Sequence, residues 1–91
     1  MQQVLIESNP SPMKMEILNV EDWPILHHEP GEFCATVDRT ETSFILSGEA
    51  ELRVEGYDPV FVMTDDLVTI LPGTVCRWHI TKAIKRHHLM G

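Results

Sequence analysis

The sequence predicts an all-β protein with one domain, folded as a sandwich or barrel of short strands. Apolar runs rich in Val, Ile, Thr and Phe recur between turn residues, at the spacing expected of such folds. Turn dipeptides, among them Pro30-Gly31, Ser47-Gly48 and Pro72-Gly73, stand between these runs. The 91 residues are enough for one modest core and too few for two. We therefore expect a single all-β domain.

The strands are assigned from these apolar runs. Between Glu49 and Val54, the residues Ala50 and Leu52 alternate with charged residues, so we expect the apolar side chains to face inward. The dipeptide Ser47-Gly48 is expected to form a turn that separates two strands. The predicted strands are 24–28, 32–38, 42–46, 49–54, 60–63, 67–71, 75–81 and 84–90.

The segment before the first of these strands is expected to hold one short helix. Ser11 can cap the helix, Pro12 suits its first turn, and the helix should end near Asn19. Its apolar side is predicted to consist of Met13, Ile17 and Leu18.

A short apolar run at 4–6 precedes the helix. This run can add an edge strand to the sheet or pair with a second copy of the chain in a homodimer, and both alternatives stay open. We divide the chain into an N-terminal arm with the short helix, residues 1–22, and a barrel, residues 23–91.

The charge distribution speaks against nucleic acid as a partner. The net charge is −7, and all 14 acidic residues lie in residues 1–76. The charged residues in 77–91 are all bases, but they are only four, which is a poor nucleic-acid footprint. We expect these basic last strands to lie beside acidic strands in the sheet.

We expect a cytoplasmic protein without a membrane partner. No basic segment followed by an apolar core opens the chain, and no apolar run approaches the roughly 20 residues that cross a bilayer. Two cysteines without a C-x-x-C pair are compatible with free thiols in a reducing compartment.

The order and spacing of the special residues resemble the cupin superfamily. Glu41 followed by six residues and Gly48 matches the second half of the first cupin motif. The stretch Asp65–Gly73 resembles the start of the second motif, and the tail VCRWHITKAIKRHH is similar to the ending of one small single-domain branch. That branch is named after the ureidoglycine aminohydrolase cupin domain. The resemblance, which runs from about Trp23 to Leu89, implies a double-stranded β-helix, also called a jelly-roll barrel.

The ligand set of a metal-binding cupin is largely missing. Such proteins usually supply two histidines as H-x-H, then the glutamate, then a histidine from the second motif. Here no histidine stands between Cys34 and Glu41, and Cys76 occupies the second-motif position. If Cys34, Glu41 and Cys76 all point into the barrel, two interpretations are possible. The three residues can form a Cys-Glu-Cys metal site, or the two cysteines can be buried thiols that only pack in the core. The missing imidazoles favour the second alternative, so we predict no metal and no other cofactor.

The histidines are expected mainly at the surface or at strand edges. The neighbours His27 and His28 must point to opposite faces of an extended strand, and so must His87 and His88. His79 should lie on the face opposite Cys76 and Trp78. One of His87 and His88 should face inward and is therefore a pocket candidate.

The candidate pocket combines a carboxylate, a thiol and an indole inside the barrel. If Glu41 faces inward, Ser43 faces the same way, while Cys76 and Trp78 come from the second-motif strand. The alternative is that Glu41 only holds the strand entrance, by pairing with backbone N–H groups, Arg77 or Lys85. The predicted ligand-binding residues are Glu41, Cys76, Trp78, Cys34 and Ser43.

The favoured hypothesis is a small cytoplasmic cupin that binds an unidentified small polar molecule in its barrel without a tightly bound metal. One alternative is a metal-dependent enzyme related to ureidoglycine aminohydrolase, which the resemblance implies. Another is a dimeric interaction module with a vestigial pocket. The sequence does not decide whether a reaction is catalysed, because a fold alone does not determine a function.

Overall fold

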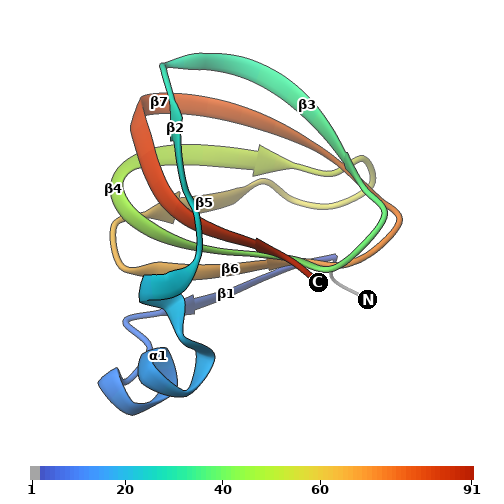
Figure 1. Cartoon of the computed structure of the whole chain (residues 1–91). Helices are drawn as coiled ribbons and strands as arrows, with labels where there is room; N and C mark the ends of the chain where they lie inside the picture. Colours follow the sequence, from blue (N-terminus) through green and yellow to red (C-terminus); the bar gives the residue numbers. More distant parts are fainter. Residues whose placement is uncertain (1–2) are drawn as a thin grey trace.

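The computed structural model describes residues 3–91 and shows an antiparallel β-fold with a short helix, as expected (Figure 1). A helix and a 3-10 turn, α1 (Pro12–Leu18) and η1 (Val20–Asp22), follow the first strand. The strands are β1 (Val4–Ser8), β2 (Ile25–His28), β3 (Gly31–Val37), β4 (Glu41–Arg53), β5 (Val60–Met63), β6 (Asp66–Ile70) and β7 (Thr74–Met90). Within the described residues, no helix is long and apolar enough to cross a membrane.

The two long strands, β4 and β7, give the molecule its two layers. The first half of β4 pairs with β6 and with the second half of β7, which in turn pairs with β2. The second half of β4 pairs with β5 and with the first half of β7, which in turn pairs with β3. Figure 1 shows both long strands curving at the left of the view, so that each contributes to both layers. The interior of the barrel lies between these layers.

The predicted turn at Ser47-Gly48 is wrong, because β4 runs through it as a bent strand. The pairing of β4 with β7 shifts register between Ile45 and Ala50, which marks a bulge. Gly48 has a φ of +106°, and a Cβ there would lie 2.2 Å from the carbonyl oxygen of Ala83. Glycine therefore lets the two bent strands approach each other without reversing the chain. The break expected between the predicted strands 75–81 and 84–90 is also absent. β7 runs continuously from Thr74 to Met90, and Ala83 lies directly against Gly48.

The apolar run at 4–6 was expected either to add an edge strand to the sheet or to pair with a second copy of the chain. In the structure it is part of an edge strand. β1 pairs with β6 from Val4↔Ile70 to Ser8↔Asp66. The sheet thus begins before the boundary expected at residue 23. The expected neighbourhood of acidic and basic strands is also present, since Lys82 Nζ on β7 lies 3.0 Å from Glu49 Oε2 on β4.

The helix begins and ends where the sequence indicated, but it packs on a different side. The backbone N–H of Lys14 donates to Ser11 Oγ at 3.1 Å, and Asn19 ends the helix in the left-handed conformation. The predicted apolar side is wrong: Met13 and Ile17 are 71 % and 72 % exposed. Instead Met15 packs on an outer cluster of Val20, Trp23 and Leu67, with Phe44 beside it. The helix thus has apolar residues on two sides, Met13 and Ile17 on one and Met15 on the other. Which of these sides becomes covered depends on where the barrel lies.

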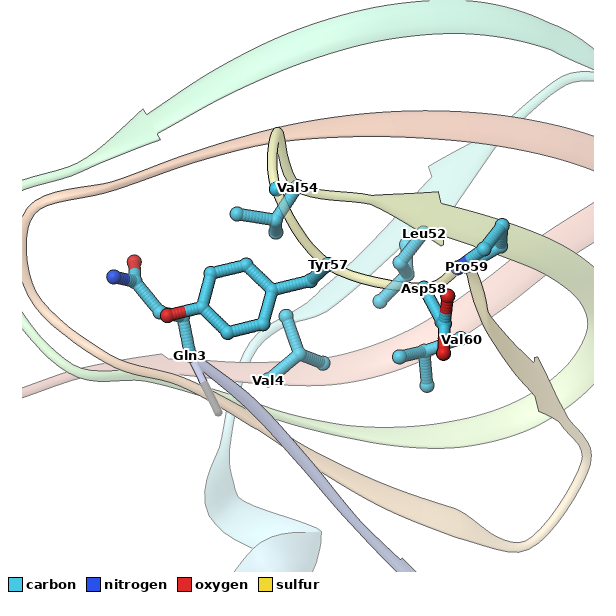
Figure 2. A pocket seen from close by; sticks show the side chains of 9 residues that line it. Gln3, Val4, Leu52, Val54, Tyr57, Asp58, Pro59 and Val60 are labelled. Carbon is cyan, nitrogen blue, oxygen red and sulfur yellow. The ribbon is translucent and has the colours of Figure 1, made fainter. Parts of the chain in front are cut away.

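One end of the barrel carries a cavity. The residues that line it come from the start of β1, the end of β4 and the β4–β5 connection, and they surround about 340 Å³ (Figure 2). Its floor includes Val4 and Leu52, which are 5 % and 1 % exposed and belong to the main core.

Candidate functional site

A buried group of polar side chains lies inside the barrel, on the layer formed by β2, β4, β6 and β7. Glu41 and Ser43 point inward from β4, whereas Arg86 and His88 point inward from β7. The register aligns Ser43 with His88 and Ile45 with Arg86, so these side chains share one face of the paired strands. His28 completes the group from β2. We call these five residues the Arg86 cluster: Glu41, Ser43, Arg86, His28 and His88.

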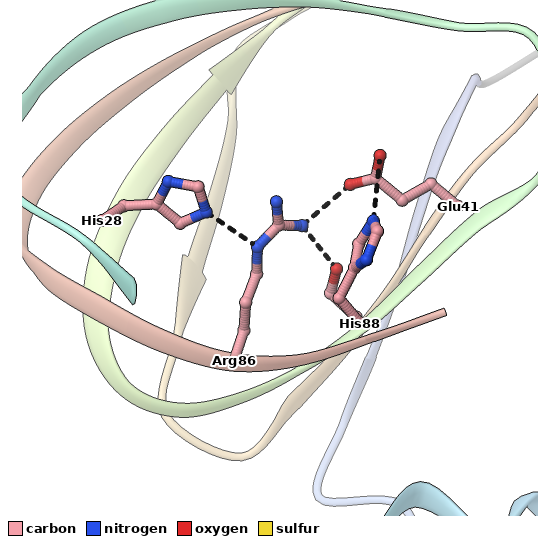
Figure 3. Close-up of polar contacts among 5 residues, drawn as sticks. His28, Glu41, Arg86 and His88 are labelled. Carbon is pink, nitrogen blue, oxygen red and sulfur yellow. Dashed lines mark hydrogen bonds and ion pairs between the residues drawn. The ribbon is translucent and has the colours of Figure 1, made fainter. Parts of the chain in front are cut away.

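Arg86 is the centre of this cluster (Figure 3). Its Nη1 donates to Glu41 Oε1 at 2.8 Å and to Ser43 Oγ at 2.6 Å, and its Nε donates to His28 Nε2 at 3.2 Å. The side chains of Arg86 and Glu41 are only 5 % and 10 % exposed. Charges removed from water need such partners, since an unpaired buried charge costs several kcal/mol.

The two histidines of the cluster lie at its margins. His88 Nε2 lies 3.6 Å from Glu41 Oε2, outside hydrogen-bond distance, and its side chain is 19 % exposed. Burial lowers the pKa of His28 from its usual 6.5, and the positive charge of Arg86 lowers it further. A neutral His28 ring can accept the Arg86 N–H at Nε2, which agrees with the geometry.

The opposite layer supplies an aromatic floor for the cluster. Phe33 on β3 and Trp78 on β7 are register partners, and their rings are nearly parallel with centroids 5.7 Å apart. The His28 ring stacks on Phe33 at 5.0 Å, and Arg86 Cζ lies 4.7 Å from the Trp78 ring. A guanidinium over an indole is a favourable cation–π pair. The Arg86 cluster thus lies directly on the two rings.

One donor in this region has no partner. Trp78 is fully buried, and its Nε1 forms no hydrogen bond with any described residue. An unsatisfied buried N–H costs about 1–3 kcal/mol. A ligand acceptor or a water molecule at this position would recover that cost.

The two predicted cysteines lie in different places. Cys76 is fully buried within the core, where burial and then the negative charge of Glu41 raise its pKa to about 11. Cys34 is exposed, so the expectation that it points into the barrel is wrong. In β3, Phe33, Ala35 and Val37 are the less exposed residues, and Ala35 is the register partner of Cys76. The prediction put Cys34 on the inner face of β3, whereas the inner face begins one residue earlier, at Phe33. A shift of one residue along a strand moves every side chain to the other face.

The residues at the positions of a cupin metal site do not fit a metal ion. Of the expected ligands only Glu41 is present, and Arg86 already holds its carboxylate. The Cys76 thiol keeps its proton at neutral pH, whereas a metal needs the thiolate. Among residues 3–91, no group of three or more His, Cys, Asp and Glu side chains has a geometry that could hold a metal ion.

The structure brings Glu41, Ser43 and Trp78 around Arg86, with Cys76 in the adjoining core. The partner of Glu41 is Arg86, and not Arg77 or Lys85 as the alternative interpretation had it. His88 is the inward-facing member of its pair, as expected. His28 was expected at the surface or at a strand edge, like the other histidines. It does lie on an edge strand, but its ring points inward.

Sequence reasoning missed Arg86, His28 and Phe33. A signal for Arg86 was present: Ile84, Arg86 and His88 continue the two-residue period of the inner face of β7. For Phe33 a signal was also present, because Phe33, Ala35 and Val37 alternate with Glu32, Cys34 and Thr36 along β3. For His28 no such signal existed, because each face of the short strand β2 carries one apolar residue and one histidine.

Comparison with known proteins agrees with the fold. A family model described as the EutQ-like cupin domain matches residues 15–88. The chain is similar to a DUF861 family protein from Thermotoga maritima, with 36 % identity, a TM-score of 0.92, and coverage of 97 % of this chain and 99 % of that one. A search of curated proteins found no match.

Two more distant structures show likeness of fold alone. The EutQ protein of Clostridium difficile is 14 % identical with a TM-score of 0.64, over 70 % of this chain and 46 % of that one. The Cnp3 cupin domain of Schizosaccharomyces pombe is 14 % identical with a TM-score of 0.58, over 100 % of this chain and 67 % of that one. The finer assignment to the ureidoglycine aminohydrolase branch stays a prediction. From the matched family model and the Thermotoga relative, we conclude that this chain belongs to the EutQ-like cupin domain family.

Proposed function

We propose that this protein binds a small polar molecule inside its barrel, at the Arg86 cluster and Trp78, without a tightly bound metal. The observation that supports the proposal is hydrogen-bonding capacity left over in a buried, otherwise well-paired site. Trp78 Nε1 has no partner among the described residues, and Arg86 makes its hydrogen bonds through Nε and Nη1, leaving Nη2. Among residues 3–91, Glu41 Oε2 has only the long contact with His88.

These leftover groups define what the ligand must offer. Two N–H donors require an acceptor such as a carbonyl or hydroxyl oxygen, and the free carboxylate oxygen of Glu41 requires a donor. With His28 neutral, the charges of Glu41 and Arg86 compensate each other. The site therefore suits an uncharged or zwitterionic polar molecule better than a simple anion, which would lie close to Glu41.

The metal-dependent enzyme is the weaker alternative for a specific reason. A metal ion at Glu41 would have to displace the guanidinium of Arg86, and the other residue at an expected ligand position, Cys76, has a raised pKa that disfavours the thiolate. The homodimer and the cytoplasmic location stay predictions. For the homodimer, the support is that β1 ends the described sheet and pairs with β6 on one side only.

A thermal-shift screen tests the proposal. A panel of ureides, small carboxylates and sugars is added to the wild-type protein and to the Glu41→Gln and Trp78→Phe variants. A ligand at about 100 times its Kd stabilises the fold by about 2.7 kcal/mol. For a domain of this size, that corresponds to a rise in Tm of roughly 10 °C or more.

We expect the shift in the wild type to shrink in both variants, because each removes one of the leftover groups. Glu41→Gln keeps the shape of the side chain, whereas Trp78→Phe replaces the buried indole with a smaller ring that has no N–H. Arg39→Met, which changes an exposed arginine outside the cluster, is the matched control and should keep the full shift. If no compound raises the wild-type Tm, or if both variants respond as the wild type does, the proposal is wrong.

A further inference from the structure

The cavity at the end of the barrel shares no residue with the Arg86 cluster, and its chemistry is different. Its floor is aliphatic, with Val4 from β1, Leu52 from β4 and Val60 from β5. Its wall is the β4–β5 connection, which contributes Tyr57 and Asp58. A volume of about 340 Å³ is within the range of small-molecule sites.

Tyr57 provides the aromatic surface of this cavity. Figure 2 shows its ring among the side chains of Val4, Val54 and Val60, and the residue is 41 % exposed. One part of the ring therefore packs on the core edge, and the rest faces the cavity and solvent. Gly56, with a φ of +86°, allows the tight connection that places this ring over the barrel end.

Asp58 decides the sign of the charge that the cavity favours. It is the charged residue in the lining, which holds no lysine, arginine or histidine among the described residues. Asp58 is exposed and forms no ion pair with any described residue. A carboxylate without a partner among the described residues, in the lining of a cavity on a protein with a net charge of −7, attracts cations.

The cavity on the other side of Tyr57 has the opposite character. It encloses about 480 Å³ and is lined by Arg53 and Arg77, with Glu55 as its carboxylate. The preference for cations is thus a property of the Asp58 side, and the two cavities can be distinguished by the charge of a probe.

We propose that the cavity lined by Tyr57 and Asp58 is a second binding site, for a small organic cation with an apolar body. The ammonium group pairs with the Asp58 carboxylate, and the alkyl part covers Leu52 and Val4 and reaches the Tyr57 ring. This site is independent of the proposal for the Arg86 cluster, so either can fail alone.

The probes are n-butylammonium, butyrate and n-butanol, titrated into the full-length ¹⁵N-labelled protein and followed by amide NMR shifts. We expect butylammonium to shift the amides of Val4, Leu52 and Val60, which line this cavity and not the neighbouring one, in a saturable way, at concentrations where butyrate and butanol do not. Asp58→Asn should weaken this binding about fivefold, which is the upper end for an exposed ion pair. Tyr57→Ala should also weaken it, because it removes the aromatic wall that the alkyl part contacts.

Asp38→Asn is the matched control, since Asp38 is an exposed aspartate outside the cavity lining. It should bind butylammonium as the wild type does. Equal binding of butyrate or butanol, full affinity in Asp58→Asn, or shifts confined to the Arg53–Arg77 side would each overturn the inference. A cooperative melt of every variant confirms that the fold is intact.

Discussion

Replacing the buried ion pair of Arg86 and Glu41 is the sharpest test of how the barrel interior is held together. Arg86→Met leaves Glu41 with one distant histidine, and Glu41→Leu leaves the guanidinium with neutral partners only. Removing one member of a buried pair costs about 3–5 kcal/mol. Since a chain of this size has a total stability of about 5–14 kcal/mol, each single variant loses a large part of it.

The double variant Glu41→Leu/Arg86→Met should be more stable than either single variant. It buries no unpaired charge, and what it loses is the hydrogen bonding of Ser43 and His28 to Arg86, worth about 1–3 kcal/mol. We therefore expect single losses of about 3–5 kcal/mol each and a double loss at least about 3 kcal/mol smaller than their sum.

Urea unfolding, followed by the fluorescence of the tryptophans, measures these losses. With an m-value of about 1–3 kcal/mol per M, a single variant should unfold at a urea concentration lower by roughly 1–5 M. Arg39→Met is the control and should stay within about 0.5 kcal/mol of the wild type. If the two single losses simply add in the double variant, Arg86 and Glu41 are not coupled, and our description of the cluster is refuted.

Three further predictions concern the bend, the thiols and His28. Gly48→Ala should lower the free energy of unfolding by at least about 3 kcal/mol, because it adds a clash with the β7 backbone to the strain of a positive φ. Gly73 also has a positive φ but has open space around it, so Gly73→Ala should cost only about 1–2 kcal/mol, measured by chemical denaturation. Cys34 should react with a thiol reagent in the folded protein at pH 8, whereas Cys76 should not, and a mass spectrum showing both modified would contradict their placement. The raised pKa of Cys76 means that the unfolded chain loses its thiol proton first, so stability should fall between about pH 9 and pH 11 in the wild type and not in Cys76→Ala. The lowered pKa of His28 has the opposite consequence: the unfolded state binds the proton first as pH drops below 6.5, so stability should fall there, and His28→Gln should flatten this dependence in melts from pH 7 to pH 5.

The sequence by itself determined the fold class and much of the inner face of the barrel. Two-residue alternation places Ala50 and Leu52 inside β4, and the same rule places Cys76 and Trp78 inside β7. These strands are covered on one face by the opposite layer, so a shift by one residue would expose the whole apolar set. The helix cap at Ser11 is equally local, because a side chain and a backbone N–H three residues on are enough to form it.

Only the tertiary structure decided where the chain bends and which polar groups meet. Gly48 reads as a turn in the sequence, and it becomes a bulge because the β7 backbone near Ala83 passes directly against it. Arg86, Glu41 and His28 come from three strands that are far apart in the sequence, so no local pattern relates them. The physical reason is that backbone conformation and alternation are properties of neighbouring residues. The pairing of a buried charge depends instead on which side chains the fold brings within hydrogen-bond distance of each other, here from β2, β4 and β7.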